Sequence, residues 1–285
     1  MIESSSFPFS IRAVAVFGSV PSGKATENSD IDLLVLAEGI KEKFHRRTAE
    51  IASIKRVLRG MPLDVLLLTP EEARSNFDNH NPLFLDIAEE GVILMDTDDF
   101  LSKLIHKTRA YIRSRGIKKF HNAWKFSVKA GEATALSEVS NKDFSSAMLR
   151  DGEKDFLVGK RILDDGYYDK AVYPFQQAAE KCVKAILIAL GVFQKTHLVG
   201  EVLRELVLKE ADVPGKWKNS LLKAAEISGE MEPEISLSRY PGIINNKLWL
   251  LFDEYEKKDA EDARQKAEIV LVIANQFTES WFTVK

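Results

Sequence analysis

Two aspartates, Asp30 and Asp32, stand at the start of an apolar stretch that follows a turn containing Gly18 and Ser19. Side chains two residues apart in a strand point to the same face, so these two carboxylates should lie together. At about 5 Å and an effective dielectric constant near 20, two carboxylates repel each other by roughly 3 kcal/mol. A divalent cation would offset this repulsion, and Mg²⁺ favours carboxylate and phosphate oxygens. The pattern therefore predicts a magnesium site.

A third carboxylate comes from another predicted strand, because Asp64 opens the apolar run 63–68. Three carboxylates from two strands would form a site for two metal ions, one activating a hydroxyl nucleophile and the other holding a triphosphate and its leaving group. Gly18 lets the backbone approach a phosphate, and Ser19 offers a hydroxyl and an N–H to it. These residues together predict chemistry on a triphosphate.

The first hundred residues alternate between predicted strands and helices, which indicates an α/β unit. Strands are expected at 12–17, 31–36, 63–68 and 92–95, and helices over 41–59 and from residue 70 towards residue 91. The second helix has a clear start, since Thr69, Pro70 and Glu72 supply a cap, a first-turn proline and a glutamate at the third position.

Residues from about 151 onward predict a helical bundle. A stripe of apolar residues at steps of three or four marks a long helix that ends at Gly191; its members are Val172, Phe175, Ala179, Cys182, Ile186 and Leu190. Further helices are expected around 198–206, with Thr196 as the expected cap, around 221–225 as a short helix, and over 263–281. Short loops between them favour an up-down bundle.

The segment between the two halves is strongly basic. Residues 100–131 contain no Asp or Glu but nine Lys or Arg, namely Lys103, Lys107, Arg109, Arg113, Arg115, Lys118, Lys119, Lys125 and Lys129. A helix is expected over 101–116, a weaker one to about residue 136, and a linker over 138–144. Aromatic residues among the cations suit RNA binding, but an amphipathic connecting helix with a solvated basic face is favoured.

Composition fits a cytoplasmic protein of two modest domains. The chain has 285 residues, a net charge of −3 and one cysteine, Cys182, which cannot form an internal disulfide. No apolar run reaches the length of a membrane span, and the N-terminus lacks the pattern of a signal peptide. We therefore expect a cytoplasmic protein with no membrane partner.

The carboxylate motif resembles that of a known superfamily. Gly18-Ser19, ten intervening residues, Asp30-Ile31-Asp32 and the later Asp64 resemble the nucleotidyltransferases of the DNA polymerase β superfamily, especially the minimal nucleotidyltransferases and kanamycin nucleotidyltransferase. The resemblance covers residues 11–94. It implies that Asp30, Asp32 and Asp64 are catalytic metal ligands and that Gly18 and Ser19 contact phosphate.

One position departs from that pattern. Many minimal nucleotidyltransferases have an arginine where this chain has Ser22. Lys24 is the candidate that supplies positive charge instead. The departure leaves open a degenerate site that binds nucleotide without turnover.

The second half resembles the HEPN domain, a helical bundle found fused or adjacent to minimal nucleotidyltransferases. The resemblance covers residues 151–282 and includes the runs 166–171, 176–181 and 196–197. It also includes Arg239-Tyr240-Pro241, whose arginine could contact a nucleotide or substrate phosphate or equally be a surface residue. HEPN ribonucleases carry an Arg and a later His that are separated by four to six residues. The bundle lacks this spacing, so His197 is expected to be a helix-start residue.

The expected fold is α+β: a nucleotidyltransferase α/β domain with a mixed sheet over 1–98, a basic helical connector over 99–150 and an all-α HEPN-like bundle over 151–285. The expected activity is metal-dependent transfer of a nucleoside monophosphate from a nucleoside triphosphate, with ATP as the expected donor, to a hydroxyl acceptor, releasing pyrophosphate. Two Mg²⁺ ions are the expected cofactors. One of the three aspartates, or a carboxylate of the bundle, would accept the proton of the hydroxyl.

Two other interpretations stay open. The chain could be a nucleotide-binding regulator without turnover, related to fused toxin–antitoxin pairs, or an RNA-binding protein that uses its basic stretch. The resemblance also implies a homodimer, for which Trp249 and Trp281 are the expected exposed aromatic residues.

Overall fold

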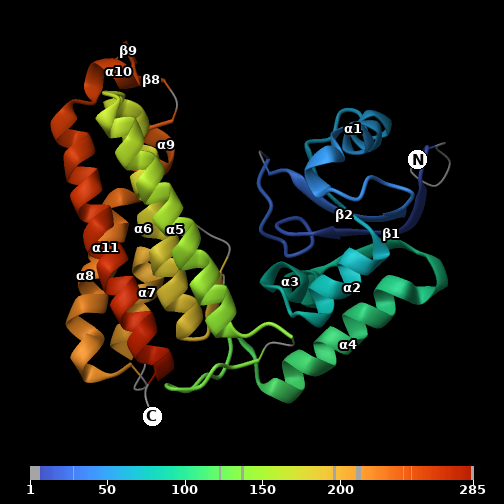
Figure 1. Cartoon of the computed structure of the whole chain (residues 1–285). Coiled ribbons are helices and arrows are strands. Elements are labelled where there is room, and N and C mark those ends of the chain that lie inside the picture. The colour runs from blue at the N-terminus through green and yellow to red at the C-terminus, as the bar shows by residue number, and fades with distance from the viewer. Residues whose placement is uncertain are drawn as a thin grey trace. The chain divides into compact units, whose positions relative to one another are not determined.

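The computed structural model describes residues 7–27, 29–121, 123–135, 138–194, 197–209, 213–239, 241–244 and 246–283. The expected cap Thr196 and Tyr240 of the motif Arg239-Tyr240-Pro241 lie outside these residues. The chain divides into two compact units between Ile117 and Lys118. The first is an α/β unit and the second is mainly helical, which confirms the expected α+β class (Figure 1). The expected connector 99–150 is shared between the two units.

A four-stranded mixed sheet forms the centre of the first unit, in the order β3-β2-β1-β4. Its strands are β1 (Ser10–Phe17), β2 (Ile31–Glu38), β3 (Leu63–Leu68) and β4 (Val92–Asp96). Strand β1 is antiparallel to β2 and β4, whereas β2 and β3 are parallel. All four predicted strands are therefore confirmed, and β3 has the predicted bounds.

Helices cover both faces of this sheet. On one face, α1 (Thr48–Val57) buries Ile54 against Val35 and Leu67. On the other face lie α2 (Pro70–Asp78), α3 (Pro82–Glu90) and α4 (Phe100–Arg115). Short 3₁₀ turns at Phe44–Arg46 and Thr97–Asp99 precede α1 and α4. In Figure 1, α1 lies above the strands and α2 to α4 lie below them.

The single helix expected from residue 70 to residue 91 is two helices. Thr69 and Glu72 form the predicted capping box of α2. The chain then turns at His80, whose φ is 50°, and the Asn81 side chain accepts a hydrogen bond from the Leu83 N–H at the start of α3. Pro82 begins α3, because a proline disrupts a helix interior but is tolerated in a first turn.

Arg47 connects three elements of the first unit. Arg47 is fully buried and forms a bidentate ion pair with Glu72, with N–O distances of 2.6 and 2.7 Å. It also donates to the carbonyl oxygens of Lys41, Glu42 and Leu67. The loop before α1, the end of β3 and the start of α2 are thereby held together.

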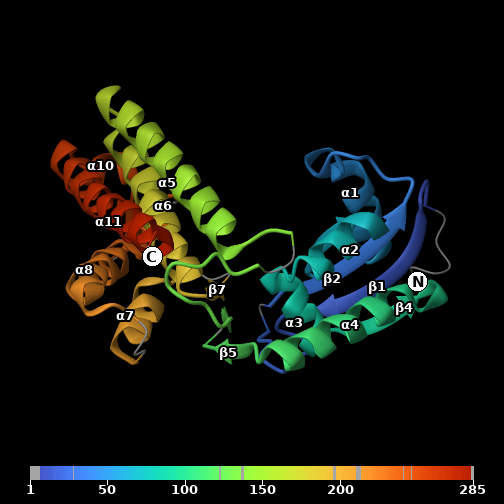
Figure 2. The ribbon, with the colours of Figure 1, turned by 60° about the horizontal axis from the view of Figure 1, so that its bottom comes forward.

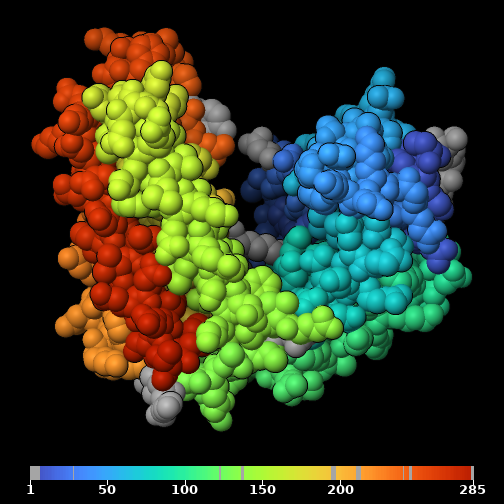
Figure 3. All heavy atoms as spheres, in the orientation of Figure 1, coloured from blue at the N-terminus to red at the C-terminus, as the bar shows by residue number. Residues whose placement is uncertain are grey.

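The second unit is built around one long central helix, α6 (Tyr168–Ala189), as predicted from the apolar stripe. It packs against α5 (Asn141–Asp164), α8 (Gly215–Met231) and α11 (Lys257–Thr283). The remaining helices are α7 (Gly200–Lys209), α9 (Glu234–Leu237) and α10 (Leu251–Glu254). Figure 2 shows α5, α6 and α11 side by side, and in Figure 3 α5 and α11 form one face of this unit.

The prediction of a weak helix up to residue 136 was wrong. The chain instead forms β5 (Lys118–Phe120) and β6 (Ala123–Lys125), which pair with each other as a hairpin, and β6 also pairs with β7 (Val192–Gln194) in a three-stranded sheet. Strand β7 comes almost seventy residues after β6, so local periodicity could not reveal that second pairing. The linker expected over 138–144 was also wrong in part, because Ser140 and Asp143 form a capping box that starts α5 at Asn141.

The surface of the second unit differs from expectation. Trp281 is buried, with 2% of its surface exposed, because it packs against Phe277. Among the described residues of this unit, the three most exposed large apolar side chains lie on the hairpin of β8 (Gly242–Ile244) and β9 (Lys247–Trp249) and on α10; they are Ile243, Leu248 and Phe252. No helix within the described residues is both long enough and apolar enough for a membrane span.

The buried ion pair gives a stability prediction. Burial opposes ionisation of Glu72, but hydrogen bonds from Arg47 and from the Thr69 N–H outweigh it, so the pKa of Glu72 is lowered from its ordinary value of 4.5. Glu72→Gln should lower the free energy of unfolding by about 1.5–3 kcal/mol, towards the lower end because the Glu72 side chain is 34% exposed. Chemical denaturation of the full chain measures the loss.

The sign of the pH dependence follows from the lowered pKa. The stabilisation is fully present above the unfolded-state pKa and disappears as the pH falls through the lower folded-state pKa. Wild type and Glu72→Gln should therefore differ at pH 7 and converge in acid. Glu71→Gln, at the exposed neighbouring position, is the matched control and should be neutral. Equal losses for both variants would contradict the role of the pair.

Candidate functional site

Asp32 and Asp64 lie next to each other at one end of the sheet. They are partners in the parallel pairing of β2 with β3, and neighbouring strands are about 4.8 Å apart. Leu34 and Leu68, an even number of positions further along the two strands, pack in the core beneath α2 to α4. Both aspartates therefore face that side of the sheet, at the end where the buried core gives way to solvent: Asp32 is half-buried and Asp64 is exposed.

Asp30 reaches the same end of the sheet but stands outside the paired strand. The N–H of Ile31 donates to the carbonyl oxygen of Pro62 at 2.7 Å, which keeps this stretch beside the start of β3. Asp30 itself is exposed. Among the described residues, no three Asp, Glu, His or Cys side chains form a group that could hold a metal ion.

Two carboxylates nevertheless suit Mg²⁺, which proteins often bind through one or two carboxylates together with substrate phosphates. The adjacent pair Asp32 and Asp64 has the right donor type for this arrangement.

Gly18 lies against the carboxylate of Asp32. It follows β1 directly and has a φ of +78°, a conformation that favours glycine. A Cβ atom at this position would lie 2.0 Å from Oδ2 of Asp32. The absence of a side chain therefore leaves room for the Asp32 carboxylate, and backbone approach here is possible only for glycine.

The turn after Gly18 is closed by its own hydrogen bonds. The Ser22 hydroxyl lies 2.9 Å from the carbonyl oxygen of Gly18 and 3.1 Å from that of Ser19. The N–H of Lys24 donates to Ser19 O at 3.0 Å, while the Lys24 side chain is exposed. Ser22 thus supports the turn, so the residue that replaces the family's arginine has a structural partner in this chain.

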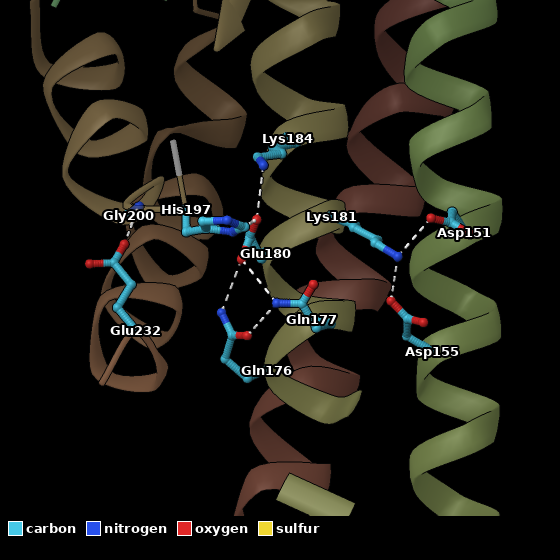
Figure 4. Close-up of polar contacts among 10 residues, drawn as sticks. All are labelled: Asp151, Asp155, Gln176, Gln177, Glu180, Lys181, Lys184, His197, Gly200 and Glu232. Atoms are coloured by element: carbon cyan, nitrogen blue, oxygen red, sulfur yellow. Dashed lines mark hydrogen bonds and ion pairs between the residues drawn. The ribbon is translucent and has the colours of Figure 1, made fainter. Parts of the chain in front are cut away.

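A second polar cluster, inside the helical unit, centres on Glu180 of α6. Glu180 is only 3% exposed, yet its carboxylate meets four donors. Lys184 Nζ and His197 Nδ1 lie 2.8 and 2.9 Å from Oε1, and the side-chain amides of Gln176 and Gln177 lie 3.2 and 3.3 Å from Oε2 (Figure 4). Each carboxylate oxygen of this buried charge therefore has two hydrogen-bond partners, as a buried ion requires.

Sequence reasoning missed this cluster. Gln176, Glu180 and Lys184 are spaced by four residues, which places them on one face of α6, and that spacing was the available signal. His197 precedes α7, as expected of a helix-start residue, but its imidazole also connects α7 to α6 through Glu180. The start of α7 receives a further contact, because Glu232 accepts a hydrogen bond from the Gly200 N–H at 2.9 Å.

Neighbouring side chains on α6 face α5. Lys181 lies 2.6 Å from both Asp151 and Asp155, as Figure 4 shows. Burial alone would lower the pKa of Lys181, but these two carboxylates raise it. Cys182 is buried as expected, and burial raises the pKa of its thiol to about 12. Lys181 therefore connects α6 to α5, and Cys182 is a buried small side chain rather than a reactive thiol.

Arg239 and much of the basic stretch already have partners. The Arg239 guanidinium lies 5.0 Å from the centre of the Tyr173 ring. In α4, Lys103 donates to Asp98 O, Lys107 pairs with Asp78 at 2.6 Å, and Arg109 donates to Ala88 O. These contacts agree with the favoured interpretation of 101–116 as an amphipathic helix.

Gly18 gives the sharpest structural prediction for this site. Gly18→Ala should cost about 1 kcal/mol for its positive φ, plus the cost of displacing Asp32. Gly23→Ala is the matched control, because Gly23 has a φ of +71° and a Cβ added there would meet no atom within 4 Å. Denaturation of the full chain should show the larger loss for Gly18→Ala. Adding Asp32→Ala should bring Gly18→Ala close to the control; an undiminished excess would contradict the contact.

Comparison with known proteins identifies both halves. Residues 2–94 match the family described as nucleotidyltransferase domain, and residues 145–277 match the HEPN domain. A putative toxin of Methanocaldococcus jannaschii is 32% identical over 145 residues, which are 51% of this chain and 95% of that protein.

Two solved structures are also similar. The protein TT1696 from Thermus thermophilus is 22% identical, with a TM-score of 0.36, and the match covers 46% of this chain and 96% of that one. A nucleotidyltransferase-like protein from Exiguobacterium sibiricum 255-15 is 15% identical, with a TM-score of 0.42, over 98% of this chain and 72% of that one. The assignment to a family is based on the two domain matches and not on these two structures, whose similarity is low. The chain belongs to the proteins that join an N-terminal nucleotidyltransferase domain to a C-terminal HEPN domain.

Proposed function

We propose that the first unit transfers a nucleoside monophosphate from a nucleoside triphosphate to a hydroxyl acceptor and releases pyrophosphate, with ATP as the expected donor. The observation that carries the proposal is the register of β2 and β3. It sets two carboxylates side by side at the end of the sheet, next to Gly18, where a side chain would collide with the carboxylate of Asp32. The match of residues 2–94 to nucleotidyltransferases supports the same chemistry.

Each residue then has a role in the proposed reaction. Asp32 and Asp64, with Asp30 beside them, would hold Mg²⁺ against the phosphates. When bound, the metal supplies positive charge to the triphosphate and to the leaving pyrophosphate. Gly18 and Ser19 would present backbone and hydroxyl donors to phosphate oxygens, and Lys24 would add positive charge from the turn.

A second candidate is a nucleotide-binding regulator without turnover. Two observations favour it: Ser22 replaces the arginine common among minimal nucleotidyltransferases, and one relative is named a putative toxin. Titration with a non-hydrolysable triphosphate detects binding under both proposals, whereas release of labelled pyrophosphate separates enzyme from regulator. The homodimer expected from the resemblance stays a prediction.

Asp32→Asn tests the metal-site assignment. The neutral amide binds Mg²⁺ poorly, so the variant should lose turnover and also the rise in melting temperature that wild type shows with Mg²⁺ and triphosphate. Without ligand the two proteins should melt close together, because the substitution keeps the side-chain shape and relieves repulsion of at most roughly 3 kcal/mol.

The control for this experiment is Glu27→Gln, which removes one exposed negative charge from the same loop. It should keep the full ligand-dependent rise. An Asp32→Asn protein that melts well below wild type without ligand, yet keeps the rise, would refute the assignment and favour a structural role for Asp32.

We also predict no ribonuclease activity. The nearest arginine upstream of His197 is Arg161, far outside the HEPN spacing. The one nearby match, Arg115 to His121, is divided between the two units, and His121 contacts Glu205 on α7. The purified chain should therefore leave labelled RNA intact in the presence of a chelator. Cleavage that disappears on His197→Ala or His121→Ala would contradict this.

A further inference from the structure

A cavity of about 410 Å³ that is open to solvent lies at the surface of the helical unit, away from the Glu180 cluster; the side chains of Lys160, Asp164 and Lys257 in its lining are exposed. It is formed where α5 ends and where α6 and α11 begin, the end of the bundle that also carries α10 (Figure 1). This volume falls within the range typical of small-molecule sites. The cavity belongs to the helical unit alone.

Three cations reach this cavity from two helices: Lys160 from α5, and Lys257 and Arg264 from α11. Their present contacts are weak. Lys257 lies 3.5 Å from Glu261, and Arg264 lies 3.4 Å from Glu268, both longer than the 2.7–2.9 Å of a strong charge-assisted hydrogen bond.

Lys160 is the most informative of the three. It has no ion-pair partner among the described residues, although Asp164 stands one turn further along the same helix and lines the same cavity. Charges that serve only helix stability commonly pair at this i, i+4 spacing, as Arg161 does with Asp165. What distinguishes Lys160 from other exposed lysines of this helix is that it lines the cavity, together with the exposed Asp164.

The rest of the lining indicates what the ligand carries besides negative charge. Asp164 and Glu261 are carboxylates, which accept hydrogen bonds and would repel a second anionic group. Tyr168, half-buried at the start of α6, offers a ring face and a hydroxyl. With three cations and two carboxylates the lining has a net charge of +1, which suits one phosphate group attached to a body rich in hydroxyls.

We propose that this cavity binds a small phosphorylated sugar. Lys160, Lys257 and Arg264 contact its phosphate, Asp164 and Glu261 accept hydrogen bonds from its hydroxyls, and Tyr168 packs against its ring. This site involves none of the residues of the nucleotidyltransferase site and does not depend on the function proposed for it.

Calorimetric titration of the full chain with ribose 5-phosphate, without Mg²⁺, tests the proposal. Binding should be detectable at millimolar concentration or below and should persist in Asp32→Asn, as expected of a site that does not use the proposed metal site of the first unit. Lys160→Gln and Arg264→Gln should each weaken binding about tenfold or more, since each removes a charged hydrogen bond. Lys154→Gln is the matched control, because Lys154 is an exposed lysine of the same helix outside the cavity, and it should leave binding unchanged.

Asp164→Asn separates a sugar phosphate site from a general anion site. Removing this carboxylate should improve binding of inorganic phosphate but lower the preference for ribose 5-phosphate over inorganic phosphate. No binding by wild type, equal effects of Lys160→Gln and Lys154→Gln, loss of binding in Asp32→Asn, or equal affinity for the two probes in wild type would each overturn the proposal.

Discussion

The parallel pairing of β2 with β3 decides where the carboxylates of the first unit lie. Because the register matches Asp32 with Asp64, two negative charges stand one strand spacing apart, on the face that α2 to α4 cover elsewhere. A shift of one residue would turn either aspartate to the other face. The antiparallel pairing of β1 then brings Phe17 opposite Asp32, so that the next residue, Gly18, meets the carboxylate. One register therefore positions the carboxylate pair and the start of the turn together.

The surrounding structure keeps this register rigid. The sheet is buried on both faces, and the fully buried Arg47 connects the end of β3 to the start of α2 and to the loop before α1. The repelling pair thus lies at the solvent-facing end of a sheet stabilised elsewhere. Such an arrangement, a locally unfavourable charge pair on a stable support, is typical of binding and catalytic sites.

Much of the first unit could be predicted from sequence because its signals are local. Alternating and continuous apolar runs located the four strands, and Thr69 with Glu72 located the start of α2. The break at His80 was missed because apolar periodicity continues across it, although Asn81-Pro82 is a local signal of a new helix start. The residue types of the candidate site were evident from sequence. The alignment of Asp32 with Asp64, and the close approach of Gly18 to the Asp32 carboxylate, depend on strand register, which residue spacing alone does not give. Asp30 precedes the first residue of β2, so its spacing from Asp32 alone did not show that it lies outside the paired strand.

The helical unit shows where local patterns fail. Its central helix was predictable from a stripe of apolar residues, but Glu180 lies within that helix as a buried charge with four donors, one of them His197 from a distant segment. Strands β5 and β6 were missed because each has only three residues, too few for a periodic pattern, and because β6 also pairs with β7, which is remote in sequence. Long-range partners explain only part of these failures, namely His197 at Glu180 and β7 beside β6. The i, i+4 spacing of Gln176, Glu180 and Lys184 and the helix start at Ser140 with Asp143 are short-range signals that could have been recognised.

A double-mutant cycle on Asp32 and Asp64 tests most directly whether the two carboxylates act as one site. Affinity for a non-hydrolysable triphosphate with Mg²⁺ would be measured for wild type, Asp32→Asn, Asp64→Asn and the double variant. If both side chains hold the same metal, each single substitution should cause most of the loss, and the second should add little. Losses that add fully, or a single variant that binds as tightly as wild type, would contradict a shared metal site.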